Sequence, residues 1–150
     1  VLNIDFHVPE TKLDFLLIDL PPGTADAVLT VMQVFPIDGV VVVFTPQDLV
    51  EMIVRKAVNM TRMMEKKVLG VVENMSYLYV PEIDKTMELF GPSRGQQMSK
   101  MADAPLLARI PVDPTIATLC DKGRIEDYEG EVVSQLARGL LDALGEPATR

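Results

Sequence analysis

The chain has 150 residues, of which 48% are hydrophobic, and a formal net charge of −8. This length suits one domain with a real core, and this hydrophobic content argues against a disordered chain. No apolar run approaches the roughly 20 residues of a membrane span, and the first ten residues lack the pattern of a signal peptide. No cluster of Lys and Arg indicates a nucleic-acid surface. The single cysteine, Cys120, excludes an internal disulfide and fits a reducing cytoplasm.

Four apolar runs predict strands that are buried on both faces. They are FLLID (15–19), GVVVVFT (39–45), KVLGVVEN (67–74) and PLLARI (105–110). Helical patterns lie between them, and strands that alternate with helices indicate right-handed crossovers and a parallel sheet. We expect one α/β domain over residues 1–150, with an irregular leader over 1–12 and an excursion over 75–95.

Three helical segments are predicted from apolar spacing. The first follows Gly23, with Thr24 as its N-cap and Asp26 in its first turn. It ends near Phe35. The second lies within 46–66, and its spacing predicts a buried face made of Leu49, Ile53, Ala57, Met60 and Met64. The last stops at Gly145 and Pro147, and packs on the sheet through Val133, Leu136, Leu140 and Leu144.

Polar and turn-forming residues follow each predicted strand. These segments are Asp19 to Gly23, Thr45 to Asp48, Asn74 to Ser76, and Pro111 to Asp113. Ligands of parallel sheets bind beyond the carboxyl ends of the strands, so all four segments should face the same edge. Asp19 ends its strand where P-loop NTPases place the acid that holds Mg²⁺, directly or through water. The following Pro-Pro-Gly stiffens the loop and leaves the Gly23 N–H free to approach a terminal phosphate.

Five segments, taken in order, closely resemble the Mrp/ApbC family of iron–sulfur cluster carrier ATPases. They are LLIDLPPGTADAVLTVMQ, VVVFTPQD, VLGVVENMSY, FG at 90–91 and IPVDPTI at 110–116. This family belongs to the deviant-Walker P-loop group, which also contains the Min and Par ATPases and nitrogenase iron protein. The resemblance covers nearly the whole chain from Leu13 onward. It implies a P-loop NTPase-like three-layer fold, ATP and Mg²⁺ as ligands, a cytoplasmic homodimer, and iron–sulfur assembly or client proteins as partners.

The resemblance also implies roles for individual residues. Asp19 is expected to be the Walker B acid on the magnesium shell, and Asp19 and Gly23 are the expected catalytic residues. Asn74 is expected to bind adenine, because a carboxamide donates and accepts side by side; a strand-end turn residue is the alternative. Other expected nucleotide contacts are Pro22, Gly23 and Thr24 in switch II and Pro111, Val112 and Asp113 in the loop that flanks the base. The family's TPQ is matched by Thr45, Pro46 and Gln47. The alternative for these residues is that they only lead into the following helix, with Thr45 near its cap.

The chain departs from the family pattern in its phosphate-binding residues. It contains no G-x-x-x-x-G-K-[ST], and GPSRGQQ (91–97) lacks the lysine and does not follow a predicted strand. The family's phosphate-binding loop lies upstream of its IDLPPGT. We therefore expect the chain to correspond to the carboxyl-terminal part of a longer ATPase, without its first strands, and to be inactive alone. A truncated chain, a fragmentary gene model and a genuine split protein remain open.

A second departure concerns the iron–sulfur cluster. The family has a C-x-x-C pair after ENMSY that holds a [4Fe–4S] cluster across a homodimer, whereas no cysteine stands between Leu78 and Gly91 here. The carboxylates of this segment, Glu82, Asp84 and Glu88, are poor replacements for thiolate and are interpreted as a solvated loop. Cys120 is expected to be buried. The absent pair opposes the cluster that the resemblance implies.

The remaining candidates favour structural roles. His7, the only histidine, has no second ligand nearby, so neither zinc nor a catalytic triad is supported. The methionines, including Met60, Met63 and Met64, are expected to fill the core, with a flexible partner surface as the alternative. The sequence thus predicts an ATPase of the Mrp type in iron–sulfur assembly or transfer. The alternatives are a non-catalytic regulatory or dimerisation module of the same fold, and a Min/Par-type positioning ATPase.

Overall fold

A three-stranded parallel sheet forms the centre of the computed structural model, which describes residues 14–21 and 26–145. Its strands are β1 (Val40–Phe44), β2 (Val68–Glu73) and β5 (Leu106–Arg109), in the order β1-β2-β5. Three of the four predicted strands and the parallel α/β arrangement are therefore confirmed. The central strand β2 is buried from Leu69 to Glu73, as a strand covered on both faces should be.

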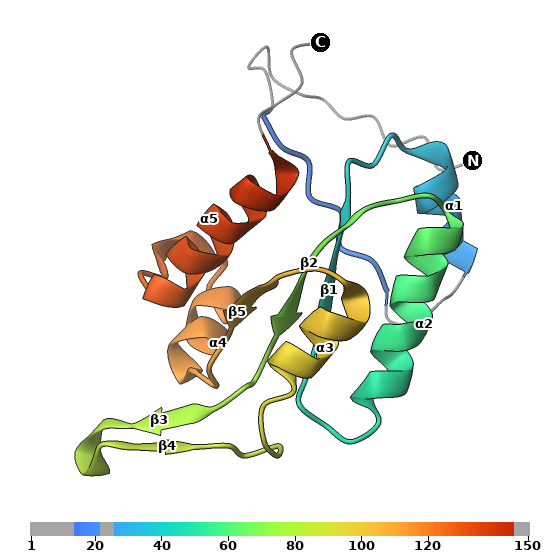
Figure 1. Ribbon diagram of the computed structural model, residues 1–150. Coiled ribbons are helices and arrows are strands. Elements are labelled where there is room, and N and C mark those ends of the chain that lie inside the picture. The colour runs from blue at the N-terminus through green and yellow to red at the C-terminus, as the bar shows by residue number, and fades with distance from the viewer. Residues whose placement is uncertain (1–13, 22–25, 146–150) are drawn as a thin grey trace.

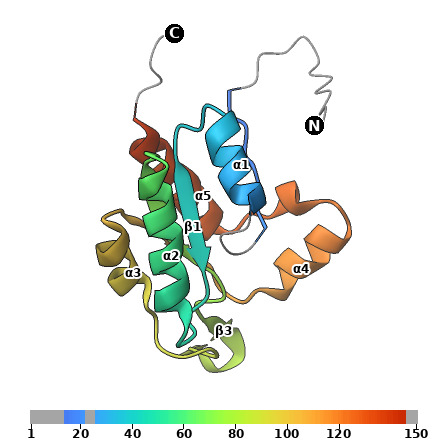
Figure 2. The same cartoon turned by 90° about the vertical axis from the view of Figure 1, so that its right-hand side faces the viewer.

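Helices lie on both faces of this sheet (Figures 1 and 2). Within the described residues they are α1 (Asp26–Val34), α2 (Val50–Met63), α3 (Gly95–Ala102), α4 (Pro114–Asp121) and α5 (Glu131–Leu144), with the short 3-10 turns η1 (Pro81–Ile83) and η2 (Ile125–Asp127). Figure 2 shows α2 and α3 on one side of β1, and α1 and α4 on the other. Gly95 of α3 lies against Leu106, and Gly139 of α5 lies against Leu107. Because successive strand residues point to opposite faces, α3 and α5 cover opposite faces of β5.

The face under α2 and α3 holds the main core. It is made of Val42 and Phe44 of β1, Val71 of β2, Val50, Val54 and Val58 of α2, and Met98 and Ala102 of α3. The valines of α2 recur every four residues, so they share one side of the helix. The predicted buried face of α2 is therefore wrong by one residue: Leu49 and Ile53 are 71% and 55% exposed. Ala57, Met60 and Met64 lie at its half-buried margin.

The predicted excursion over 75–95 contains a β-hairpin that extends away from the sheet (Figure 1). Strands β3 (Leu78–Val80) and β4 (Lys85–Met87) pair antiparallel, with Tyr79 opposite Thr86. Every residue from 81 to 90 is exposed, so the expectation of a solvated loop at Glu82, Asp84 and Glu88 is confirmed. The Tyr79 hydroxyl donates to Asp84 Oδ1 at 2.8 Å and closes the tip of the hairpin.

The first predicted strand is not present in the structure. Residues 15–19 have no strand pairing, and the side chains of Phe15 to Ile18 are 40–81% exposed. The prediction of a buried strand there is wrong for this structure, because a strand requires a neighbour for its N–H and C=O groups. In the part of the chain that the structure describes, β1 pairs with β2 alone.

Several smaller expectations are also settled by the structure. Cys120 is exposed, not buried, because α4 buries none of its residues. Thr45 does not cap α2, which begins five residues later at Val50. The core role of methionine is confirmed for Met32 and Met98 and wrong for Met63, which is 78% exposed. Helix α5 ends at Gly145 as predicted and packs on β5 and β2. No helix among residues 14–21 and 26–145 is long and apolar enough to cross a membrane.

Candidate functional site

Three of the four predicted loops meet at the carboxyl edge of the sheet. The Asn74 N–H donates to the Phe44 carbonyl at 2.7 Å, which joins the ends of β2 and β1. The Ser76 N–H donates to the Ile110 carbonyl at 2.8 Å, which joins the ends of β2 and β5. The segments 45–48, 74–76 and 111–113 therefore lie at one edge, as parallel strands require.

The fourth loop is only partly within the described residues. Asp19 is exposed, and it forms no hydrogen bond or ion pair with the rest of the described chain. Pro22, Gly23 and Thr24 lie outside the described residues. The magnesium role of Asp19 and the phosphate roles of this loop stay predictions.

Asn74 occupies a tight turn directly after β2. Its Oδ1 accepts from the Met75 N–H at 2.9 Å, and Met75 has a left-handed backbone with φ 53°. Within the described residues its side-chain nitrogen donates to no acceptor. Asn74 is thus a turn residue whose carboxamide keeps an unused donor and a spare lone pair among the residues that the structure describes.

The loop over 111–113 leads into α4. Asp113 is the N-cap of that helix: its Oδ1 accepts from the Thr115 N–H at 2.8 Å, and its Oδ2 accepts from the Tyr128 hydroxyl at 2.9 Å. These bonds, that from the Thr115 N–H foremost, lower the pKa of Asp113 despite some burial. Burial and the same Asp113 contact raise the pKa of Tyr128. The side chain of Asp113 therefore has a structural role, and its nucleotide role stays a prediction.

A groove of about 540 Å³ separates this loop from the hairpin. Its lining is Tyr77, Leu78, Tyr79, Pro81, Pro111, Val112, Asp113 and Pro114. Aromatic rings and prolines give flat apolar walls of the kind on which a planar ring packs. Asn74 is not part of this lining, although the Ser76–Ile110 bond and a 2.7 Å bond from the Val112 N–H to the Tyr77 carbonyl tie its turn to the groove.

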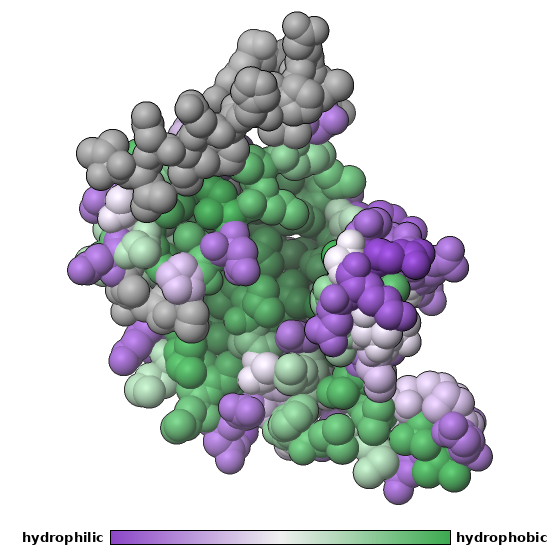
Figure 3. Space-filling view, turned by 180° about the vertical axis from the view of Figure 1, so that it is seen from behind, coloured by the Kyte–Doolittle hydropathy of each residue, from purple (hydrophilic) through white to green (hydrophobic). Residues whose placement is uncertain are grey.

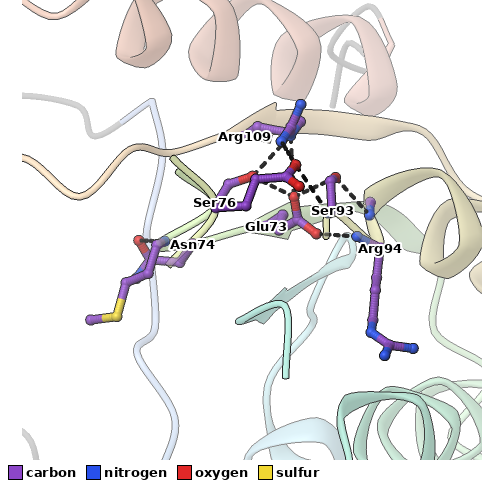
Figure 4. Close-up of polar contacts among 9 residues, drawn as sticks. Glu73, Asn74, Ser76, Ser93, Arg94 and Arg109 are labelled. Carbon is purple, nitrogen blue, oxygen red and sulfur yellow. Dashed lines mark hydrogen bonds and ion pairs between the residues drawn. The ribbon is translucent and has the colours of Figure 1, made fainter. Parts of the chain in front are cut away.

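A buried carboxylate at the end of β2 was not identified from the sequence. Glu73 is 0% exposed. Its Oε2 accepts from Ser76 Oγ at 2.5 Å and Ser93 Oγ at 2.7 Å, and its Oε1 accepts from the Arg94 N–H at 2.6 Å. Figure 4 shows Asn74 on one side of Glu73, with Ser93 and Arg94 on the other. A charge within the apolar run VLGVVEN was the signal that could have indicated this cluster.

The hydrogen bonds keep Glu73 ionised in spite of its burial. Burial alone would raise the pKa of this carboxyl, but donors from Ser76, Ser93 and the Arg94 N–H outweigh it. Arg109 adds a further bond, with its Nε 3.2 Å from Glu73 Oε2 and 2.8 Å from Ser76 Oγ. The pKa of Glu73 therefore lies below its usual value of 4.5.

The donor set of the chain does not fit an iron–sulfur cluster. Among the described residues, no group of three or more His, Cys, Asp or Glu side chains could hold a metal ion. Cys120 is the only cysteine of the sequence and lies on α4, whereas such clusters usually take four thiolates. A cluster held by this chain would need most of its ligands from elsewhere.

Comparisons with known proteins agree with the resemblance found in the sequence. The family model described as "ParA: NUBPL iron-transfer P-loop NTPase" matches residues 5–144. An iron–sulfur cluster carrier protein of Clostridium perfringens is 43% identical over 131 residues, which cover 86% of this chain and 46% of the relative. One from Saccharolobus solfataricus is 41% identical over 113 residues, covering 75% of this chain and 38% of the relative.

A solved structure supports the same assignment. The nucleotide-binding protein of Archaeoglobus fulgidus, in complex with ADP, is 42% identical with a TM-score of 0.73, and the match covers 81% of this chain and 50% of that one. The present chain spans half or less of the length of these relatives. The family predicted from the sequence and its P-loop NTPase-like fold are confirmed: the chain belongs to the NUBPL-type iron-transfer P-loop NTPases, the family of the iron–sulfur cluster carrier proteins.

Proposed function

We propose that this chain supplies the base-binding half of an ATP-dependent iron–sulfur carrier. The observation that carries the proposal is the carboxyl edge of the sheet. There the turn that holds Asn74 leads into Tyr77, which lines a groove together with Pro111 and Val112. The relative of known structure is described in complex with ADP, which supports a nucleotide at this edge.

The residues present fit the base better than the phosphates. The free donor and spare acceptor of Asn74 match the edge of adenine, and the groove offers apolar walls for the ring. Asp19 would take part in the magnesium shell, and Pro22 to Thr24 would face the terminal phosphate. The sequence contains no G-x-x-x-x-G-K-[ST], so the phosphate cradle would come from polypeptide outside these 150 residues.

Hydrolysis would serve as a switch between protein conformations. Bound ATP supplies a γ-phosphate, and loops that contact it become ordered and are released after hydrolysis. The iron–sulfur cluster is cargo in this scheme, delivered to client proteins by a homodimer. Its ligands would lie mainly outside this chain, because two copies offer only two Cys120 thiolates against the usual four.

The test is the effect of Asn74→Ala on nucleotide choice in the full-length protein that carries this chain. ATP affinity should fall by about 1–3 kcal/mol, the range for a bidentate contact to a base edge, and the preference for ATP over GTP should fall with it. Isothermal titration with Mg-ATP and Mg-GTP measures both. Asn59→Ala, an exposed asparagine of α2, is the matched control and should change neither.

Two results would contradict this proposal. A destabilised Asn74→Ala protein with an unaltered ATP/GTP ratio would make Asn74 a turn residue only. Micromolar Mg-ATP binding by the 150-residue chain alone would show that the phosphates do not need a separate cradle.

A second candidate function is a regulatory or dimerisation module of the same fold. The absent phosphate loop favours it. The titration with Mg-ATP and Mg-GTP distinguishes the two candidates, because a regulatory or dimerisation module would bind neither nucleotide even within the full-length protein.

A further inference from the structure

We propose that Glu73 and Ser76 are positioning residues for Asn74, and that they set its preference for adenine. The proposal rests on the nucleotide role of Asn74 given above. Its starting point is the hydrogen bond from the Met75 N–H to Asn74 Oδ1, at 2.9 Å. This bond fixes which side of the carboxamide faces the backbone, and leaves the nitrogen as the outward donor.

The turn that supplies this N–H needs support. Met75 has a φ of 53°, a left-handed conformation that residues with a side chain rarely adopt. Such a backbone persists only where its surroundings hold it in place. The Met75 side chain is exposed and therefore contributes little packing to hold it.

The support comes from the residues on either side of Asn74 and Met75. Ser76 Oγ donates to Glu73 Oε2 at 2.5 Å, so the two side chains close the turn over residues 73–76. The Asn74 N–H and the Ser76 N–H donate to Phe44 and Ile110, which hold both ends of the turn to the sheet. Glu73 and Ser76 are both 0% exposed, so no water competes for their bond.

Glu73 is in turn anchored from the side of the cluster away from Asn74 (Figure 4). Ser93 Oγ and the Arg94 N–H, which precede α3, donate to its two oxygens. Arg109, at the end of β5, bonds both Glu73 and Ser76. These bonds therefore hold the Glu73 carboxylate in place, and it provides a fixed acceptor to which Ser76 bonds.

The orientation of the Asn74 carboxamide matters for choice between bases. Adenine offers a donor beside an acceptor at its edge. A carboxamide turned by half a revolution exchanges its oxygen and nitrogen, so that its donor faces the donor of adenine and its acceptor faces the acceptor. A side chain that is already held in the productive orientation loses less entropy on binding. Loss of the Glu73–Ser76 bond should thus reduce discrimination between ATP and GTP more than it reduces binding of nucleotide as such.

The experiment compares Ser76→Ala with Ser93→Ala in the full-length protein that carries this chain. Each variant removes one hydroxyl donor from the same Oε2, but only Ser76 closes the Asn74–Met75 turn. The ratio of ATP to GTP affinity, measured by titration, should fall about five-fold or more in Ser76→Ala, as the loss of one oriented hydrogen bond implies. It should stay within about two-fold of the parent in Ser93→Ala, while both variants melt at similarly lower temperatures.

A second measurement does not depend on nucleotide. Hydrogen exchange of the Met75 N–H, followed in the same proteins, should become faster in Ser76→Ala and stay unchanged in Ser93→Ala. Equal effects of the two variants on both measurements would overturn the proposal, because Glu73 would then stabilise the fold without orienting Asn74.

Asn74→Ala separates this proposal from the one on which it rests. If Asn74→Ala lowers the ATP/GTP ratio and Ser76→Ala does not, Asn74 binds the base without help from Glu73 and only the positioning role fails. If Asn74→Ala leaves the ratio unchanged, the base role itself fails and the positioning role with it.

Discussion

The two faces of the sheet are packed to different degrees. Under α2 and α3, Val54, Val58, Val71 and Met98 are at most 1% exposed and form one continuous core. On the opposite face, α1 buries Val28 and Met32, but no residue of α4 or α5 is buried, and Val43 of β1 is 60% exposed. Among the described residues, the core cluster of buried apolar side chains therefore lies on the face under α2 and α3.

The less packed face has the character of a contact surface. Figure 3 views the molecule from this side, and apolar side chains cover its middle and line a hollow there. The exposed Phe15 to Ile18 add to the apolar surface of the chain. Contiguous exposed apolar surface is typical of sites that contact further protein. Substitutions on the packed face should thus change folding, whereas those on the other face should change assembly.

Met98→Ala should give the largest loss of stability. Met98 is 0% exposed, and truncation of a buried methionine leaves a cavity that costs about 2–5 kcal/mol. Met63→Ala, at the exposed end of α2, is the matched control and should change the free energy of unfolding by less than about 0.5 kcal/mol. Urea unfolding of the 150-residue chain measures both, and similar losses would show that the packed face is not the dominant core.

Glu73→Gln should have the next largest effect, about 2 kcal/mol at neutral pH, because it removes a buried charge from its donors. The loss depends on pH with a definite sign. The folded pKa lies below 4.5, so the unfolded chain binds more protons as the pH falls through this range. The stabilisation by Glu73 is complete above about 4.5 and disappears as the pH falls through the folded pKa.

The parent and the Glu73→Gln variant should therefore converge in stability at acid pH. Urea unfolding at several pH values between 7 and about 3 would detect the convergence. Glu129→Gln, an exposed control, should follow the parent throughout. A constant difference between parent and Glu73→Gln would mean that the folded carboxyl titrates at its usual pKa.

Local patterns were sufficient to predict the elements that hold the site. Apolar runs rich in valine mark β1 and β2, and parallel topology then brings Asn74 and Pro111 to one edge. The same rule failed at 15–19, because an apolar run becomes a strand only where another strand can pair with it. Strand propensity was visible in the sequence, and the pairing partner was not.

Contacts between distant residues could not be predicted in this way. On α2, the series from Leu49 and the series from Val50 have the same four-residue spacing, and only contact with β1 selects the second. The Glu73 cluster joins Ser93, Arg94 and Arg109, which lie 20 to 36 residues further along the chain. Side-chain networks of this kind arise only when the fold brings distant residues together. The one local sign of this cluster in the sequence is Glu73, a charged residue within an apolar run.

Val43→Ala should have the smallest effect, and it is the most direct test of the comparison between the faces. Val42 and Val43 are neighbours on β1 and point to opposite faces, the first 7% and the second 60% exposed. In the 150-residue chain, Val42→Ala should cost about 1–3 kcal/mol, as the loss of buried methyl groups does. Val43→Ala should cost less than about 0.5 kcal/mol, because its side chain leaves little water on folding.

The same pair, measured in the longer ATPase that we propose for this chain, shows whether more polypeptide covers the second face. If it does, Val43→Ala should there approach the cost of Val42→Ala, since both side chains would be buried. Urea unfolding of all four proteins gives the comparison. A cost for Val43→Ala that stays small in that proposed longer protein would mean that this part of β1 remains open to solvent, and that the apolar hollow serves a contact with a separate molecule.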